Sequence, residues 1–71
     1  MTVYQISIGI ELDESLQTWF EDCRITAGNG TTLLICQISD QAGLYGILSR
    51  IQNLGLPLLE AVIIEKKIQG E

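Results

Sequence analysis

The dipeptide Asn29-Gly30 constrains the fold more than any other feature of the chain. Both central positions of a two-residue type I′ turn need a positive φ angle, and Asn followed by Gly tolerates this best. The dipeptide therefore predicts a β-hairpin over residues 22–38 and fixes its register. The opposed pairs on one face of this hairpin are Ala27 with Thr32, Ile25 with Leu34, and Cys23 with Cys36.

A strand and a short helix are predicted before the hairpin. Apolar and polar side chains alternate over residues 4–12, which is typical of a strand with one buried face. Asp13 can accept hydrogen bonds from the free N–H groups at a helix start. Leu16, Trp19 and Phe20 follow at helical spacing. We expect them on one side of a helix of about two turns, with Trp19 and Phe20 in the core.

A second helix and a last strand are predicted after the hairpin. The helix begins at Ser39-Asp40, and Gly55 and Pro57 end it, because Gly suits a left-handed C′ position and Pro cannot continue a helix. The last strand covers residues 58–66, and both of its faces are apolar. One stripe of the helix is predicted to be buried: Leu44, Ile47, Leu48, Ile51 and Leu54.

The order strand, helix, hairpin, helix, strand indicates an α+β fold. With right-handed crossovers it gives a ferredoxin-like βαββαβ sandwich, a four-stranded antiparallel sheet with two helices on one face. A chain of 71 residues is too short for two separate cores. We therefore expect a single ferredoxin-like domain over residues 1–71.

The face of the sheet without helices is predicted to be apolar. Burying one such side chain contributes about 1.5–3 kcal/mol before association costs. A core of this size also leaves a thin stability margin. We therefore expect a homo-oligomer, a dimer or larger, or an unidentified protein partner, at this face. The predicted interface residues are Leu33, Ile35, Val62 and Ile64.

Charge and composition argue against several kinds of partner. The chain has nine acidic and four basic residues and a formal charge of −5. Its cations form no stripe that could contact phosphates, so neither nucleic acid nor a membrane is expected as a partner. The first residues do not resemble a secretory signal, and no stretch approaches the roughly 18 apolar residues of a membrane span. We expect a cytoplasmic protein.

The absence of histidine limits the chemistry of the chain. A structural zinc site would lack half of its usual ligand types, so no metal and no cofactor are expected. No Ser-His or Cys-His pair can form, and neither GxGxxG nor GxxxxGK[ST] occurs. No catalytic residue is therefore expected, and the sequence favours a non-enzymatic protein.

Cys23 and Cys36 have two interpretations. A reducing cytoplasm favours free thiols that fill small spaces on the core face. The predicted register, however, makes them a non-hydrogen-bonded pair with Cα atoms about 4.5 Å apart, which is within the range for a disulfide. A redox-responsive protein that uses Cys23 and Cys36 is therefore an alternative.

The start of the second helix also has two interpretations. Asp40 is expected to cap the helix. Gly43 and Gly46 each cost about 1 kcal/mol against alanine within a helix, so something is expected to approach closely there. Close packing against a strand or another subunit is one explanation. A small ligand bound by Asp40, Gln41, Gly43 and Gly46 is the other.

Two resemblances begin at Gly30. Residues 30–34 and 40–59 resemble a family of small uncharacterised bacterial proteins with a DQAALHGLLxRIRDLGL-type segment. Residues 40–44, together with Ile51, Leu54 and Gly55, are similar to the D-x-P-G-L…I…L…G pattern of ACT domains, although Ala42 replaces the proline. ACT domains are ferredoxin-like regulatory modules that often bind amino acids between subunits. This resemblance implies an amino-acid sensor as an alternative to an interaction, scaffold or regulatory module.

Overall fold

The hairpin around Asn29-Gly30 forms one edge of a four-stranded sheet in the computed structural model, which describes residues 1–66. Strands β2 (Cys23–Gly28) and β3 (Thr31–Ile38) are antiparallel. The φ angles of Asn29 and Gly30 are 57° and 81°, as a type I′ turn requires. The predicted register is confirmed, because Gly28 lies opposite Thr31 and Cys23 lies opposite Cys36.

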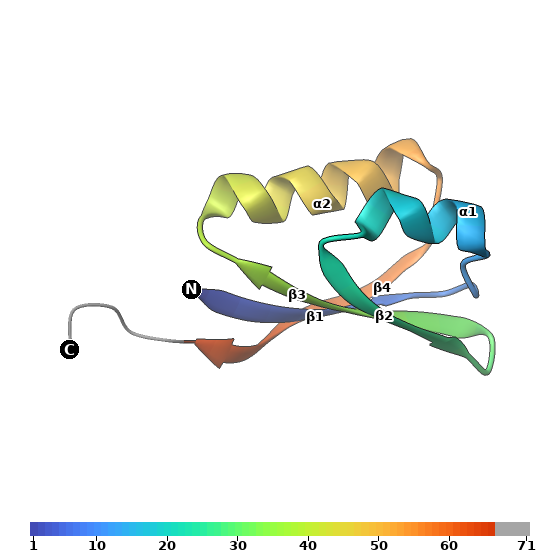
Figure 1. The fold of residues 1–71 in the computed structure, drawn as a ribbon, viewed down its shortest axis with the longest axis horizontal. Coiled ribbons are helices and arrows are strands. Elements are labelled where there is room, and N and C mark those ends of the chain that lie inside the picture. Colours follow the sequence, from blue (N-terminus) through green and yellow to red (C-terminus); the bar gives the residue numbers. More distant parts are fainter. Residues whose placement is uncertain (67–71) are drawn as a thin grey trace.

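Strands β1 (Thr2–Ile8) and β4 (Leu58–Lys66) complete the sheet (Figure 1). The strand order is β2-β3-β1-β4, and all neighbouring strands are antiparallel. In the described chain β2 and β4 are therefore the edge strands. The pairing of β4 with β1 shifts register near each end, where β4 carries an extra residue.

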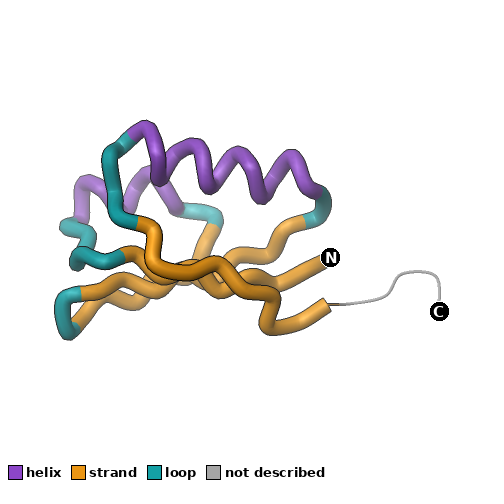
Figure 2. Tube along the Cα trace, turned by 180° about the vertical axis from the view of Figure 1, so that it is seen from behind, coloured by secondary structure: helices purple, strands orange, loops and turns teal. Residues whose placement is uncertain are grey.

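The helices lie on one side of this sheet, and the other face is uncovered (Figure 2). The fold is thus α+β, with a four-stranded antiparallel sheet and two helices. None of the helices within residues 1–66 is long and apolar enough to cross a bilayer. The helical elements are α1 (Glu14–Gln17), the 3-10 turn η1 (Thr18–Phe20) and α2 (Gln41–Asn53).

Both predicted N-caps are confirmed. Asp13 Oδ1 accepts the N–H of Leu16 at 2.9 Å, and Asp40 Oδ1 accepts the N–H of Gly43 at 2.8 Å. The predicted end of α2 is confirmed as well, with a φ angle of 70° at Gly55. The Gly55 N–H donates to the Gln52 carbonyl and the Leu56 N–H donates to the Ile51 carbonyl, both at 3.0 Å, which is a Schellman motif.

The core lies between the sheet and the helices. Phe20 is fully buried, as predicted, but the prediction for Trp19 is wrong, because its side chain is 53% exposed. The helix tightens into the 3-10 turn η1 at these residues, which changes the side of the helix that each side chain faces. The buried hydrophobic residues are Ile6, Ile8, Leu12, Phe20, Leu34, Cys36, Ile38, Ile47 and Ile51.

The first strand is shorter than predicted, because β1 ends at Ile8 and not at residue 12. The Gly9 N–H donates to the Pro57 carbonyl at 2.8 Å, and the chain bends away from the sheet there. Ile10 is consequently exposed, whereas Leu12 is buried after the bend. The alternating pattern continues through the bend, so the pattern alone could not locate the end of the strand.

The Asp13 cap gives stability a pH dependence. The Leu16 N–H, and then the Ser15 hydroxyl, lower the pKa of the Asp13 carboxyl below its ordinary value. A folded-state pKa below the unfolded one means that the cap stabilises the fold above the unfolded pKa, and that this stability is lost as pH falls through the folded pKa. Asp13→Asn, which keeps a capping group, should flatten the acid side of the curve of unfolding free energy against pH.

This prediction is checked by urea unfolding at a series of acid pH values and by NMR titration of the Asp13 carboxyl. Glu60→Gln is the control, because it removes an exposed carboxylate from β4. An Asp13 titration midpoint at or above about 3.9, the ordinary value for Asp, would contradict the prediction.

Candidate functional site

The uncovered face of the sheet, called the open face below, is the first candidate site. Ile35 and Val62 lie on either side of Gln5, and Leu33 lies opposite Ser7. Leu34 is buried on the helix-covered face. Successive side chains of a strand point to opposite faces, so its neighbours Leu33 and Ile35 point to the open face. Ile35 and Val62 are half-buried and Leu33 is exposed. The predicted placement of these three residues is thus confirmed, and their role as an interface stays a prediction.

Ile64 lies on the open face at the extra residue of β4. It lines a hollow of about 480 Å³ that crosses all four strands. Its neighbour Ile63 lies opposite Tyr4 and therefore on the helix-covered face. The two side chains are exposed to nearly the same extent, 50% for Ile64 and 52% for Ile63. The hollow is lined by Val3, Asp22, Arg24, Ile35, Gln37, Ile64 and Glu65.

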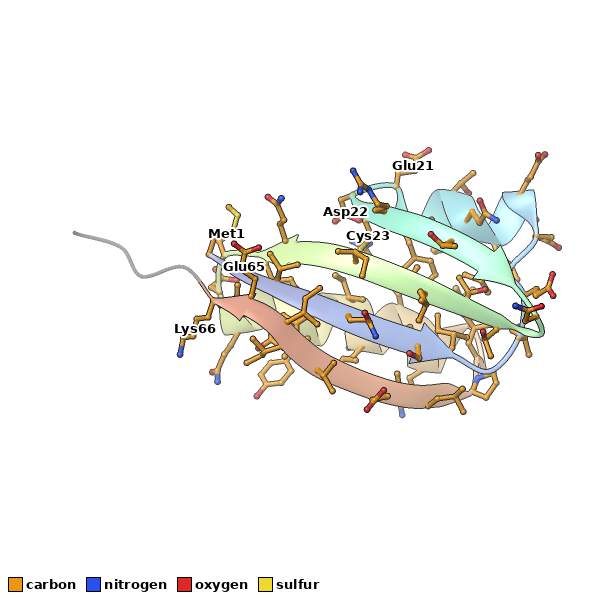
Figure 3. The ribbon with its side chains drawn as sticks, turned by 90° about the horizontal axis from the view of Figure 1, so that it is seen from below. Met1, Glu21, Asp22, Cys23, Glu65 and Lys66 are labelled. Atoms are coloured by element: carbon orange, nitrogen blue, oxygen red, sulfur yellow. A yellow bond between two sulfur atoms is a disulfide. The ribbon has the colours of Figure 1, made fainter. Side chains whose placement is uncertain are left out.

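The lining of the hollow combines apolar and charged side chains. Figure 3 looks onto the open face and shows Asp22, just before β2, and Glu65, on β4, at opposite edges of the sheet. Arg24 follows Asp22 on β2 and lies opposite Ile35. The described lining includes no hydroxyl, thiol or amine nucleophile, and it suits contact with a surface that carries both apolar and charged groups.

The second candidate site is the Cys23–Cys36 pair, which forms a disulfide. The Cα atoms are 4.5 Å apart, the distance of a non-hydrogen-bonded antiparallel pair. The expectation of free thiols is therefore wrong. It rested on the expected compartment, whereas the hairpin register places the two side chains in bonding position. Cys36 is 1% exposed and Cys23 is half-buried.

The third candidate site is the start of α2. Packing within the chain explains one of its two glycines. A Cβ atom on Gly43 would lie 3.2 Å from Ile38 Cγ2, so the end of β3 requires a glycine there. At Gly46 no described atom of the chain would lie within 4 Å of a Cβ, so packing within the described chain does not explain this glycine. Asp40 already accepts the Gly43 N–H, and Gln41 is exposed. Ligand binding at these residues stays a prediction.

The comparisons with known proteins give a family. Residues 3–61 match the model of a family described as a domain of unknown function, DUF8691. The chain belongs to this family. Searches of curated proteins and of solved structures gave no match. The DUF8691 region includes both cysteines and the open-face residues Leu33 and Ile35, whereas Val62 and Ile64 follow it.

The sequence did not indicate two residues that hold the DUF8691 domain together. Thr32 is fully buried, and its hydroxyl accepts the Leu12 N–H at 2.9 Å and donates to the Ile10 carbonyl at 2.8 Å. Arg50 Nη1 donates to the Trp19 carbonyl at 3.0 Å and so links α2 to η1. The sequence signal that could have indicated Thr32 is a threonine among apolar residues on the predicted core face. The signal for Arg50 is a lone cation on α2.

The described residues of the DUF8691 domain offer little for a metal. Within residues 1–66, no three His, Cys, Asp or Glu side chains are grouped so that they could hold an ion. The acidic residues near α1 are exposed to solvent. Among residues 1–66, the open face and the disulfide are the candidate sites that are developed below.

Proposed function

We propose that this chain is a non-enzymatic module that self-associates through the open face of a ferredoxin-like sheet. The proposed fold name is supported by the two crossovers: α1 joins β1 to β2, α2 joins β3 to β4, and each crossover passes one intervening strand. We place the function in the cytoplasm, where a disulfide such as Cys23–Cys36 is typically transient and redox-active.

One observation carries the proposal: apolar side chains of β3 and β4 lie on the open face, on either side of Gln5 and Ser7 of β1. Leu33 and Ile64 are exposed, and Ile35 and Val62 are half-buried. An apolar face in a small domain is the kind of surface that proteins bury against a partner. A second copy of the chain is the partner that the charges on this face favour.

The charges on the face are arranged so that two copies complement each other. Arg24, Ile35 and Val62 lie in one row across the sheet. On β4, Glu60 precedes Val62 by two residues and Glu65 follows it by three. If two open faces stack about a two-fold axis along the strands, β2 of one copy lies over β4 of the other. Each Arg24 then lies between Glu60 and Glu65 of the other copy.

The size of the face sets the expected affinity. Four strands of about seven residues present roughly 450 Å² of planar area per copy. A standard interface buries about 800 Å² per partner, so this contact belongs to the small class. We therefore expect a dimer with a dissociation constant in the micromolar range.

Ile64→Lys should raise the dissociation constant of the dimer at least about tenfold. Burying one isoleucine contributes about 1.5–3 kcal/mol, and a two-fold dimer loses this contribution twice. Sedimentation velocity from micromolar to millimolar protein measures the effect. Ile63→Lys is the matched control, because it changes the neighbouring isoleucine of equal exposure on the other face.

A charge swap tests the stacking direction. Arg24→Glu should weaken the dimer, and Arg24→Glu combined with Glu60→Arg and Glu65→Arg should restore it. A wild-type chain that stays monomeric throughout the concentration series would refute the proposal. Equal effects of Ile64→Lys and Ile63→Lys would show that the open face is not the interface.

A further inference from the structure

The two cysteines of the Cys23–Cys36 disulfide differ in their exposure to solvent. Cys36 lies on the central strand β3 and belongs to the hydrophobic core, with 1% of its surface exposed. Cys23 begins the edge strand β2 and is half-buried. Figure 3 shows Cys23 at the start of its strand, directly after Glu21 and Asp22. A reagent from solvent can therefore reach the disulfide at Cys23 and not at Cys36.

A surface hollow leads to Cys23. It has a volume of about 320 Å³ and lies between the α1–η1 segment and β2. A thiolate must approach a disulfide sulfur from the side opposite the sulfur that leaves. For attack on Cys23 that side faces away from β3, beyond the sheet edge. The residues that line the hollow are Glu14, Gln17, Thr18, Glu21, Cys23 and Ile25.

The entrance to the disulfide is acidic. Glu14 and Glu21 line the hollow itself. Asp22 Oδ1 lies 4.0 Å from Cys23 Sγ. Arg50 lies 3.6 Å from the Asp22 carboxylate and offsets part of its charge. An incoming thiolate therefore meets a net negative field, which repels it more strongly if the reagent carries further negative charge.

We propose that the disulfide is a thiol–disulfide exchange site that is entered at Cys23 Sγ and selects against anionic thiols. The reagents that fit are neutral or cationic thiols, and dithiols of another protein whose contact surface is not acidic. Glutathione carries a net negative charge and is the kind of reagent that this entrance disfavours. The inference is independent of the proposed self-association.

The exchange is a two-electron reduction of the disulfide by two thiols. A thiolate attacks Cys23 Sγ, a new S–S bond joins the reagent to Cys23, and the Cys23–Cys36 bond breaks with its electron pair on Cys36 Sγ. Cys36 then takes a proton from solvent. A second reagent thiolate attacks the reagent sulfur of the mixed disulfide and releases Cys23, which is protonated in turn. The products are two protein thiols and one oxidised reagent.

The first test measures charge selectivity on the wild-type chain. Cysteamine, 2-mercaptoethanol and 3-mercaptopropionate are cationic, neutral and anionic thiols. Their reduction rates are divided by thiolate concentration and by their rates on a small uncharged disulfide. Each additional negative charge should slow reduction about three- to tenfold at low ionic strength, and salt should remove most of the difference. Equal corrected rates would overturn the proposal.

Matched variants separate the local entrance from the net charge of the whole chain. Glu14→Gln with Glu21→Gln should bring the three corrected rates together. Tyr45→Lys with Gln52→Lys changes the net charge equally at exposed positions of α2 that belong to neither proposed site, and it should keep the wild-type ranking. If the α2 pair changes the ranking as much as the α1–η1 pair, the selectivity does not arise at the entrance and the proposal fails.

The second test identifies the sulfur that is attacked. The wild-type chain is treated with 2-mercaptoethanol, quenched with acid during reduction, and digested for mass spectrometry. The mixed disulfide should map to Cys23 at least about tenfold more often than to Cys36, because only the half-buried sulfur is in reach. A mixed disulfide equally divided between the cysteines, or mainly on Cys36, would contradict entry at Cys23.

Discussion

Phe20→Ala should lower the free energy of unfolding by about 3–5 kcal/mol, the usual cost of removing a buried aromatic side chain. Phe20 is fully buried and closes η1, and none of the residues of α1 is fully buried. The α1–η1 segment therefore depends on this side chain for its attachment to the core. A domain of this length has a total stability of about 4–11 kcal/mol, so the loss is a large share of it.

Urea unfolding followed by far-ultraviolet circular dichroism measures this effect. Trp19→Ala is the matched control, because it removes the larger, half-exposed neighbour and should cost about 1 kcal/mol or less. Phe20→Leu gives a smaller, measurable loss in case the alanine variant is unfolded. A cost for Phe20→Ala no larger than that for Trp19→Ala would contradict the assigned role.

Thr32→Val should lower the free energy of unfolding by about 2–4 kcal/mol, although valine has nearly the same shape. The threonine hydroxyl holds the Leu12 N–H and the Ile10 carbonyl. Valine would leave the buried N–H of Leu12 without a partner, which costs about 1–3 kcal/mol, and would also remove the second hydrogen bond. The loop after β1 would then lose its attachment to the hairpin.

Hydrogen exchange shows whether this loss occurs at the expected place. The Leu12 amide should lose protection in Thr32→Val and keep it in Thr32→Ser, which retains the hydroxyl. Thr31→Val is a second control, since the Thr31 hydroxyl donates to Gly28 at 3.3 Å in an exposed turn. Unchanged Leu12 protection in Thr32→Val would show that this hydrogen bond does not hold the loop.

The sequence predicted local features well where one residue type meets a specific backbone demand. Asn29-Gly30 predicted the hairpin register, and with it the opposition of Cys23 and Cys36. Asp13, Asp40 and the Gly55 helix end were predicted for the same reason, since each satisfies groups that a helix end leaves free. The alternation of side chains then placed Leu33 and Ile35 on the open face.

The features that the sequence did not predict depend on contacts between distant elements. The end of β1 depends on a hydrogen bond from the Gly9 N–H to the Pro57 carbonyl, 48 residues later in the chain. The exposure of Trp19 depends on a 3-10 turn that its own spacing does not show. The position of Thr32 in the alternating pattern is that of a core residue. Its hydrogen bonds depend on the position of the loop that contains Ile10 and Leu12, which the sequence pattern does not show.

The position of β1 has a consequence for synthesis on the ribosome. β1 is made first, yet both of its neighbours in the sheet, β3 and β4, come later in the chain. The hairpin of β2 and β3 can form as soon as it emerges, but Thr2 reaches its second partner only when Lys66 has been translated. The last pairing to form in the sheet is therefore that of β4 with β1, the first strand to be synthesised. A translational pause before residue 58 would leave one edge of β1 unpaired and open to pairing with other chains.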